Sequence, residues 1–286
     1  MSHISLPSMV QALRPKQWIK NLLVVAAPLA AAKLFHSGVP QNLLLAFFAF
    51  AFVASAGYII NDLRDVERDK TNPTKSHRPL ASGKISKNQA HLLIVLCIIA
   101  GIGLALSLNL AFQITLLCYF IFTTSYSFGL KHQPVIELMI VALGFVMRAI
   151  GGAAATNTPI SKWFLVVTAF GSLVVVTSKR LAEAESLANV NVRPVIREYP
   201  LPFLRFVLAT SAGVTLTGYS LWALSLNQST PYAAISLLPL CLGLFRYVWM
   251  VEKGSGEVPE DLLLRDPVLI TSAVSIALLL AFSIYP

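Results

Sequence analysis

Four long runs without a charged residue restrict this chain to folds that lie in a membrane. They are Ser37–Asn61, Leu92–Leu130, Phe206–Phe245 and Pro267–Pro286. A helix that crosses a bilayer needs about 20 consecutive apolar residues, so each run is long enough to span. Only 12% of the 286 residues are charged, whereas a soluble domain has about 25% charged residues. The mean hydropathy of +0.71 agrees with a membrane protein.

The second and third runs are about twice the length of one span and break at polar residues, near 107–109 and 227–231. We therefore predict an all-α integral membrane protein with nine transmembrane helices in one polytopic domain, residues 1–286. The expected helices cover residues 20–35, 41–60, 90–107, 111–129, 134–154, 161–178, 204–226, 232–250 and 267–285. The expected substrate loops cover approximately residues 61–89, 179–203 and 251–266.

The charged residues lie almost entirely at one end of these helices. Of the 22 Lys and Arg residues, only Lys33 and Lys162 fall in loops after odd-numbered helices, and Arg148 lies within a helix. The other nineteen lie in the N-terminal segment or near the loops after even-numbered helices. The positive-inside rule places this charge-rich face in the cytoplasm. We therefore expect a multi-pass protein of the bacterial plasma membrane whose active site faces the cytoplasm.

The net charge of +9 suits an anionic membrane surface or an anionic substrate. Nucleic acid is not an expected partner, because the basic residues are spread over membrane loops instead of one groove-reading element. Cys97, Cys118 and Cys241 lie in apolar runs, and their spacing predicts neither a metal site nor disulfides.

Acidic residues follow the second expected helix at regular spacing. If that helix continues, Asp62, Asp65 and Asp69 stand at i, i+3 and i+7 on one face, with Tyr58 one turn below and Asn61 beside them. Like charges at this spacing destabilise a helix, so a compensating cation is expected. Mg²⁺ takes oxygen ligands and prefers one or two carboxylates together with substrate phosphates. The alternative is a solvated helix end whose acids pair with nearby Arg64, Arg68 and Lys70.

A basic loop follows this acidic helix end. Residues 71–87 contain Lys75, Arg78, Lys84 and Lys87, together with Pro73, Pro79 and Gly83. An acidic stripe beside a proline-braced basic loop can bind a metal ion on one side and phosphates on the other.

The pattern Asn61-Asp62-x-x-Asp65-x-x-x-Asp69 resembles the first aspartate-rich motif of the UbiA superfamily of intramembrane prenyltransferases. The resemblance implies a helical bundle around a central cavity, with a magnesium–diphosphate site at its cytoplasmic end. Asp62, Asp65 and Asp69 would then be the catalytic residues and the metal ligands.

Most members of that superfamily carry a second aspartate-rich motif after the sixth helix, where this chain has Lys179-Arg180-x-Ala182-Glu183. The change resembles the decaprenyl-phosphate phosphoribosyltransferase branch, as do segments 14–21, 73–79, 128–133, 148–152, 161–165 and 259–261. This resemblance implies transfer of 5-phosphoribose from phosphoribosyl pyrophosphate to a polyprenyl phosphate, with release of diphosphate. The lipid product would supply arabinose donors for the cell envelope.

The resemblance and the charges together give a set of expected substrate-binding residues. Lys75 and Arg78 would contact donor phosphates, while Lys179 and Arg180 would bind a second phosphate, on the donor or on the lipid. Glu183 would orient Lys179 or reach the ribose hydroxyls. The full set is Asn61, Tyr58, Lys20, Lys75, Arg78, Tyr126, Lys131, Arg148, Lys179, Arg180 and Glu183.

Several alternatives remain open at this stage. Arg148 is either functional or a structural partner of Glu137 or of a backbone carbonyl. Loop polarity explains Lys131, and the common interfacial placement of tyrosine explains Tyr126. Prenylation of an aromatic acceptor is the first competing function. The second is transport, although transporters place their ionisable residues near the bilayer midplane. Small residues, including those at 151–152, would permit close helix packing and homo-oligomers.

Overall fold

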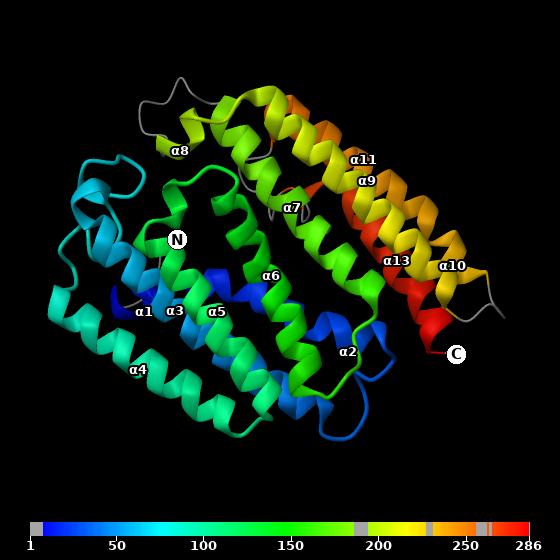
Figure 1. Cartoon of the computed structure of the whole chain (residues 1–286), viewed down its shortest axis with the longest axis horizontal. Coiled ribbons are helices and arrows are strands. Elements are labelled where there is room, and N and C mark those ends of the chain that lie inside the picture. Colours follow the sequence, from blue (N-terminus) through cyan, green and yellow to red (C-terminus); the bar gives the residue numbers. More distant parts are fainter. Residues whose placement is uncertain (1–7, 186–193, 227–230, 256–261, 263–264, 286) are drawn as a thin grey trace, which may run out of the picture. The chain divides into compact units, whose positions relative to one another are not determined.

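The computed structural model describes residues 8–185, 194–226, 231–255, 262 and 265–285 (Figure 1). Within these residues all regular elements are helical, as predicted, and eight helices are long and apolar enough to cross a membrane. Six of them are single elements between α3 and α9, one combines α10, α11 and η3, and the last is α13. Their bounds are α3 Val39–Lys70, α4 Lys87–Leu106, α5 Leu110–Phe128, α6 Ile136–Ala155, α7 Lys162–Glu185, α9 Leu201–Ser225, α10 Tyr232–Ile235, α11 Leu237–Met250, η3 Val251–Ser255 and α13 Pro267–Ile284.

The segment expected to form the first span, residues 20–35, differs from the prediction. It begins inside η1 (Pro15–Val25), a 3₁₀ helix, and continues into the short helix α2 (Ala26–Ala30). Pro28 lacks a backbone donor, and Ala32 has φ +58°, a left-handed conformation that ends a right-handed helix. An apolar run therefore passes through this region without forming an α-helix of spanning length.

The described chain divides into two compact units. Unit 1 contains Met1–Leu29, Lys33–Lys131 and Met147–Pro159, and unit 2 contains Ala30–Ala32, His132–Val146 and Ile160–Pro286. One of the points where the chain passes between the units, Val146 to Met147, falls within α6. The interpretation of residues 1–286 as one domain stays a prediction.

In unit 1, α3 packs against α4, α5 and η1. Phe50, on α3, is fully buried and makes edge-to-face contacts with Phe112 and Tyr119 of α5, with ring centroids 5.7 and 5.2 Å apart. Such aromatic pairs contribute about 0.5–1.5 kcal/mol each beyond their buried area. Side chains cap both following helices: Ser86 and Gln89 form a capping box on α4, and Asn109 accepts the Phe112 N–H of α5.

In unit 2, α7 packs along α9, and α11 packs along α13. Their core includes Leu181, Leu204 and Leu208, together with Ile196 of the short helix α8 (Pro194–Arg197). This packing fixes the end of α7, which carries the cationic motif expected to bind a phosphate.

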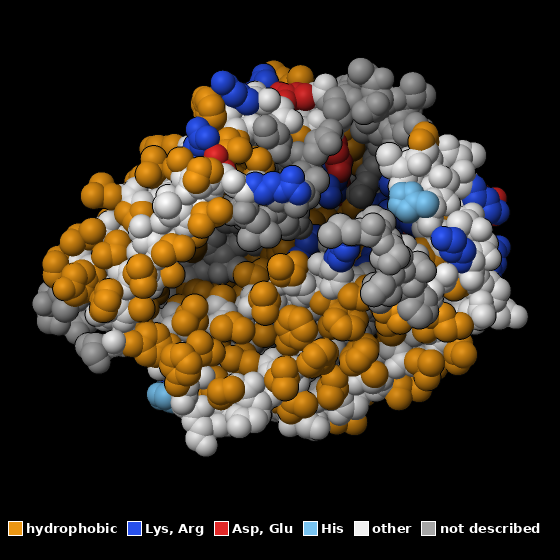
Figure 2. All heavy atoms as spheres, turned by 180° about the vertical axis from the view of Figure 1, so that it is seen from behind, with side chains coloured by type: hydrophobic (Ala, Val, Ile, Leu, Met, Phe, Trp, Pro, Cys, Tyr) orange, Lys and Arg blue, Asp and Glu red, His pale blue; other side chains and the backbone are white. Residues whose placement is uncertain are grey.

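Hydrophobic side chains cover broad areas of the surface, as Figure 2 shows, and the charged side chains in that view occupy a much smaller part. The exposed hydrophobic side chains include large residues in the middle of helices, among them Ile99, Leu117, Leu221 and Leu278. Water-soluble monomers rarely expose such extensive apolar surface, whereas lipid tails solvate it. The chain is an integral membrane protein.

The helix cap of α13 gives a prediction that depends on pH. Asp266 accepts the N–H groups of Val268 and Leu269 and pairs with Arg246, whose hydrogen bond holds the pKa of Asp266 below its usual range. A lowered folded-state pKa stabilises the fold above the ordinary carboxyl pKa, and this contribution is lost as the pH falls through the folded value. We expect Asp266→Asn to keep the cap but lower the thermal midpoint in detergent at pH 7. The difference from the natural protein should shrink below about pH 4; a difference independent of pH would contradict the assignment.

Candidate functional site at the end of helix α3

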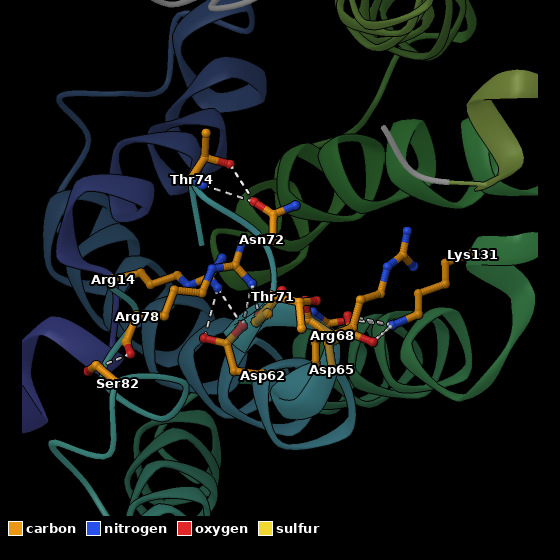
Figure 3. A network of polar contacts seen from close by, with 12 residues as sticks. Arg14, Asp62, Asp65, Arg68, Thr71, Asn72, Thr74, Arg78, Ser82 and Lys131 are labelled. Carbon is orange, nitrogen blue, oxygen red and sulfur yellow. Dashed lines mark hydrogen bonds and ion pairs between the residues drawn. The ribbon is translucent and has the colours of Figure 1, made fainter. Parts of the chain in front are cut away.

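Helix α3 continues without interruption to Lys70, so it carries all three aspartates of the acidic stripe, as predicted. The side chains of Asp62 and Asp69 are only 6% and 4% exposed, while that of Asp65 is 24% exposed. Buried carboxylates require partners, and Figure 3 shows a network of polar contacts around them.

Two arginines from other parts of unit 1 bind Asp62. The Nη2 atom of Arg14 lies 2.6 and 2.8 Å from the two carboxylate oxygens. The Nη1 atom of Arg78 donates to Asp62 Oδ1 at 3.0 Å and to Asp69 Oδ2 at 2.7 Å. A single cationic nitrogen therefore bridges Asp62 and Asp69.

Asp65 has a different cationic partner. The Nζ atom of Lys131 donates to both oxygens of Asp65, at 2.6 and 2.7 Å, and to Asn61 Oδ1 at 3.1 Å. Across the part of the chain that the structure describes, no three His, Cys, Asp or Glu side chains are gathered as a metal site. The stripe thus has two parts, the Asp62–Asp69 pair with its arginines and Asp65 with Lys131.

The neighbouring cations of α3 have other contacts. Lys70 pairs with Glu67 at 2.9 Å, and the Arg64 guanidinium lies 4.2 Å from the centre of the Phe128 ring. The alternative of a helix end neutralised by Arg64, Arg68 and Lys70 therefore does not describe these aspartates, which form ion pairs with residues more distant in the sequence.

Arg14 is a site residue that the sequence reasoning missed. Its backbone is left-handed, with φ 54° and ψ 58°, at a position where the following proline disfavours the α conformation. Its guanidinium lies 5.1 Å from the centre of the Tyr58 ring, one turn before Asp62. Its only signal in the sequence was the resemblance of residues 14–21 to the family.

Ser55 ties the segment around Arg14 to α3. The Ser55 hydroxyl donates to the Leu13 carbonyl and accepts the Trp18 indole N–H. The two contacts hold the chain on both sides of Arg14, so its guanidinium stays close to the acidic end of the helix.

Local hydrogen bonds shape the loop that carries Arg78. The Asn72 side chain accepts from the backbone N–H and the hydroxyl of Thr74, and Ser82 donates to the Arg78 carbonyl. Leu80 is buried in a small apolar cluster with residues of α3 and α4. These contacts hold the Arg78 guanidinium over α3.

Arg148 is buried in unit 1 and joins three elements. Its Nε donates to Asn21 Oδ1 of η1 and its Nη2 donates to the hydroxyl of Tyr119 on α5, both at 2.7 Å. These contacts, with a side-chain amide and a phenol, favour a structural role. One turn later Gly152 lies directly against the backbone of Val24, in agreement with the close packing expected at 151–152.

In unit 2, Arg180 near the end of α7 has two carboxylate partners. Its Nε and Nη2 bind Glu137, and its Nη1 donates to Glu183 Oε2 at 2.8 Å. The sequence suggested Glu137 as a partner of Arg148, whereas the structure shows Glu137 bound to Arg180. Glu183 also accepts from Arg180, and its expected role, orienting Lys179 or reaching the ribose hydroxyls, stays a prediction. Lys179 itself is exposed.

The remaining expected site residues are part-exposed in unit 1. Lys20 lies in η1, Lys75 in the basic loop and Tyr126 in the last turns of α5. Their substrate contacts stay predictions, as do the metal and substrate roles of the residues described above.

Comparisons with known proteins agree on the family of this chain. The model of the UbiA prenyltransferase family matches residues 22–283. The chain is 37% identical to a decaprenyl-phosphate phosphoribosyltransferase of Corynebacterium glutamicum, over 97% of this chain and 86% of that protein. It is 39% identical to the protein of the same name from Mycobacterium tuberculosis, over 91% of this chain and 88% of that protein.

Solved structures agree on the fold. A UbiA homologue from Archaeoglobus fulgidus bound to DMAPP and Mg²⁺ superposes with a TM-score of 0.75 at 20% identity, covering 97% of this chain and 99% of that one. The same homologue bound to Cd²⁺ gives a TM-score of 0.70 at 20% identity, covering 98% and 100%. On the family match and the identity to its members, this chain belongs to the UbiA prenyltransferase family.

Proposed function

We propose that this protein transfers 5-phosphoribose from phosphoribosyl pyrophosphate to a polyprenyl phosphate and releases diphosphate. The observation that carries the proposal is the 37–39% identity, over at least nine-tenths of the chain, to decaprenyl-phosphate phosphoribosyltransferases. The product, a polyprenylphosphoryl-5-phosphoribose, would feed the synthesis of arabinose donors for the cell envelope. The proposed location is the bacterial plasma membrane with the site facing the cytoplasm, and the protein could form homo-oligomers.

The end of α7 favours this function over prenylation of an aromatic acceptor. A prenyl diphosphate enzyme would use metal-binding carboxylates there, whereas this chain has Lys179 and Arg180. Transport is disfavoured because the acidic stripe lies at a helix end, while transporters place such groups near the midplane.

The donor atoms around Asp62 fit Mg²⁺. Asp62 and Asp69 already share one cationic nitrogen, that of Arg78, and Mg²⁺ commonly takes one or two carboxylates with water and substrate phosphates. These two aspartates would hold the ion, with Asp65 proposed as a further ligand. A bound Mg²⁺ would neutralise charge on the departing diphosphate.

The cations around the stripe would bind the donor. Arg14, Arg78 and Lys131 bind carboxylate oxygens in this structure. Diphosphate oxygens accept the same kind of charge-assisted hydrogen bond from Arg and Lys. Lys75 and Lys20 would add further phosphate contacts. Tyr58, which stacks on Arg14, would orient that guanidinium.

The reaction itself needs little proton transfer. A phosphate oxygen of the lipid bonds to C1 of the ribose while the bond from C1 to the diphosphate oxygen breaks. The lipid phosphate is largely ionised at pH 7, since its second pKa is about 6, so no general base is required. Catalysis then consists of positioning the substrates and stabilising the leaving group. Lys179 would bind the remaining phosphate, on the donor's C5 or on the lipid.

A labelled-substrate assay tests the proposal. We expect purified protein with Mg²⁺, polyprenyl phosphate and phosphoribosyl pyrophosphate labelled in the ribose to move label into the organic phase. Chelation of divalent ions should stop the transfer, and added Mg²⁺ should restore it. Label that enters the organic phase only from a prenyl diphosphate with an aromatic acid would support the competing function instead.

A further inference from the structure

A buried carboxylate at the start of α6 holds the arginine near the end of α7. The Glu137 side chain is fully buried and the Arg180 side chain is 5% exposed. Arg180 Nε lies 2.9 and 3.1 Å from the two Glu137 oxygens, and its Nη2 donates to Oε2 at 2.8 Å. Three hydrogen bonds in a buried ion pair fix the plane of the guanidinium.

Tyr199 completes this buried network. Its hydroxyl donates to Glu137 Oε1 at 3.4 Å and accepts the N–H of Val135 at 2.7 Å. Val135 has φ +66°, a left-handed conformation that a β-branched residue adopts only when its surroundings impose it. Burial raises the pKa of Tyr199 to about 12, so the phenol remains a neutral donor at pH 7.

The other side of Arg180 meets a carboxylate that solvent can reach. Its Nη1 donates to Oε2 of Glu183 at 2.8 Å, and the Glu183 side chain is 25% exposed. Hydroxyl donors suit an ionised carboxylate such as this one, which only accepts hydrogen bonds.

We propose that Glu137 and Tyr199 are positioning residues that act through Arg180 to hold Glu183 as the acceptor for the ribose hydroxyls of the donor. The inference rests on the proposed function and deepens it. It assigns the cationic motif two tasks, because Arg180 orients Glu183 while the exposed Lys179 serves the phosphate. In chain order the network links the turn before α6, the buried end of α7 and the segment that precedes α9.

Kinetics that separate the two substrates test this network. We expect Glu183→Gln to raise the KM for phosphoribosyl pyrophosphate about tenfold, as loss of a hydrogen bond to a charged group does. The KM for polyprenyl phosphate should stay unchanged. The same variant should discriminate less between the ribosyl donor and its 2-deoxyribosyl analogue. Glu137→Gln and Tyr199→Phe should shift the donor KM in the same direction by a smaller factor.

A double variant distinguishes positioning from a general structural effect. If Glu137 acts through Glu183, the pair Glu137→Gln with Glu183→Gln should raise the donor KM no more than Glu183→Gln alone. The matched control is Glu185→Gln, two residues further along α7, whose exposed pair with Arg205 should matter less than about twofold. Thermal midpoints identify variants that fail to fold, and Tyr199→Phe carries the test if Glu137→Gln is one of them.

The outcomes separate the inference from the function on which it rests. Two results would overturn the positioning network while leaving the function intact. One is an unchanged donor KM in Glu183→Gln. The other is a donor KM in the double variant that rises by the product of the two single effects. Absence of phosphoribosyl transfer by the natural protein would overturn both.

Discussion

Replacing Asp62 with alanine should abolish phosphoribosyl transfer while the protein still folds. Asp62 accepts hydrogen bonds from both Arg14 and Arg78 and shares the latter with Asp69. Its loss would remove a proposed magnesium ligand and also the carboxylate that aligns the two arginines. We expect the turnover at saturating substrate to fall at least about a hundredfold, as for removal of one preorganised electrostatic group. The measurement is label transfer into lipid, at several Mg²⁺ concentrations.

Two variants on the same helix make this result interpretable. Asp62→Asn keeps the shape but removes the charge, so it should lose activity with a smaller change in thermal midpoint than Asp62→Ala. Glu67→Gln removes a carboxylate that pairs with the exposed Lys70, and it should leave turnover within about twofold. Unchanged turnover of Asp62→Ala at saturating Mg²⁺ would refute the role of this residue.

The geometry of an ideal helix explains why the three aspartates separate into two groups. With 3.6 residues per turn, Asp62 and Asp69 point only about 20° apart around the axis, whereas Asp65 lies about 60° from Asp62. The first two can therefore share Arg78, while Asp65 turns toward Lys131. The sequence predicted a common face, and this finer division follows from the same spacing.

The cations that bind the stripe were harder to predict. Arg14 lies 48 residues before Asp62, and Lys131 lies 66 residues after Asp65. Hydrophobic periodicity locates elements along the chain but does not say which loops meet in space. Arg78 and Lys131 joined the expected site through charge and family resemblance, and Arg14 joined it only through the structure. The pairing of Glu137 with Arg180, 43 residues apart, is another contact of this kind.

The fold class was predictable for a different reason. Within lipid every backbone polar group must be satisfied inside the protein, so long apolar runs must be helical. Eight described helices of spanning length follow from that rule. The first expected span does not, because hydropathy averages residues and gives no weight to Pro28 or to the left-handed backbone at Ala32.

Substituting Gly152 with alanine should severely destabilise unit 1. A Cβ atom there would overlap the carbonyl carbon and oxygen of Val24 and stand 2.6 Å from its Cα. These are backbone atoms, so no side chain can rotate away, and η1 would have to move. The movement would also strain the bond from Arg148 to Asn21, three residues before Val24. We expect a loss of about 3 kcal/mol or more in unfolding free energy, at the upper end of overpacking penalties.

Gly103 provides the matched control for this substitution. It lies inside α4, and the position that a Cβ atom would take there is open space. Replacing a helical glycine with alanine stabilises by about 0.5–1 kcal/mol. Thermal unfolding in detergent should therefore move in opposite directions for Gly152→Ala and Gly103→Ala. A compensating substitution cannot rescue the first, because the clash is with the main chain of Val24. If Gly152→Ala had the same thermal midpoint as the natural protein and kept its activity, the tight contact between η1 and α6 would not contribute to the stability of the fold.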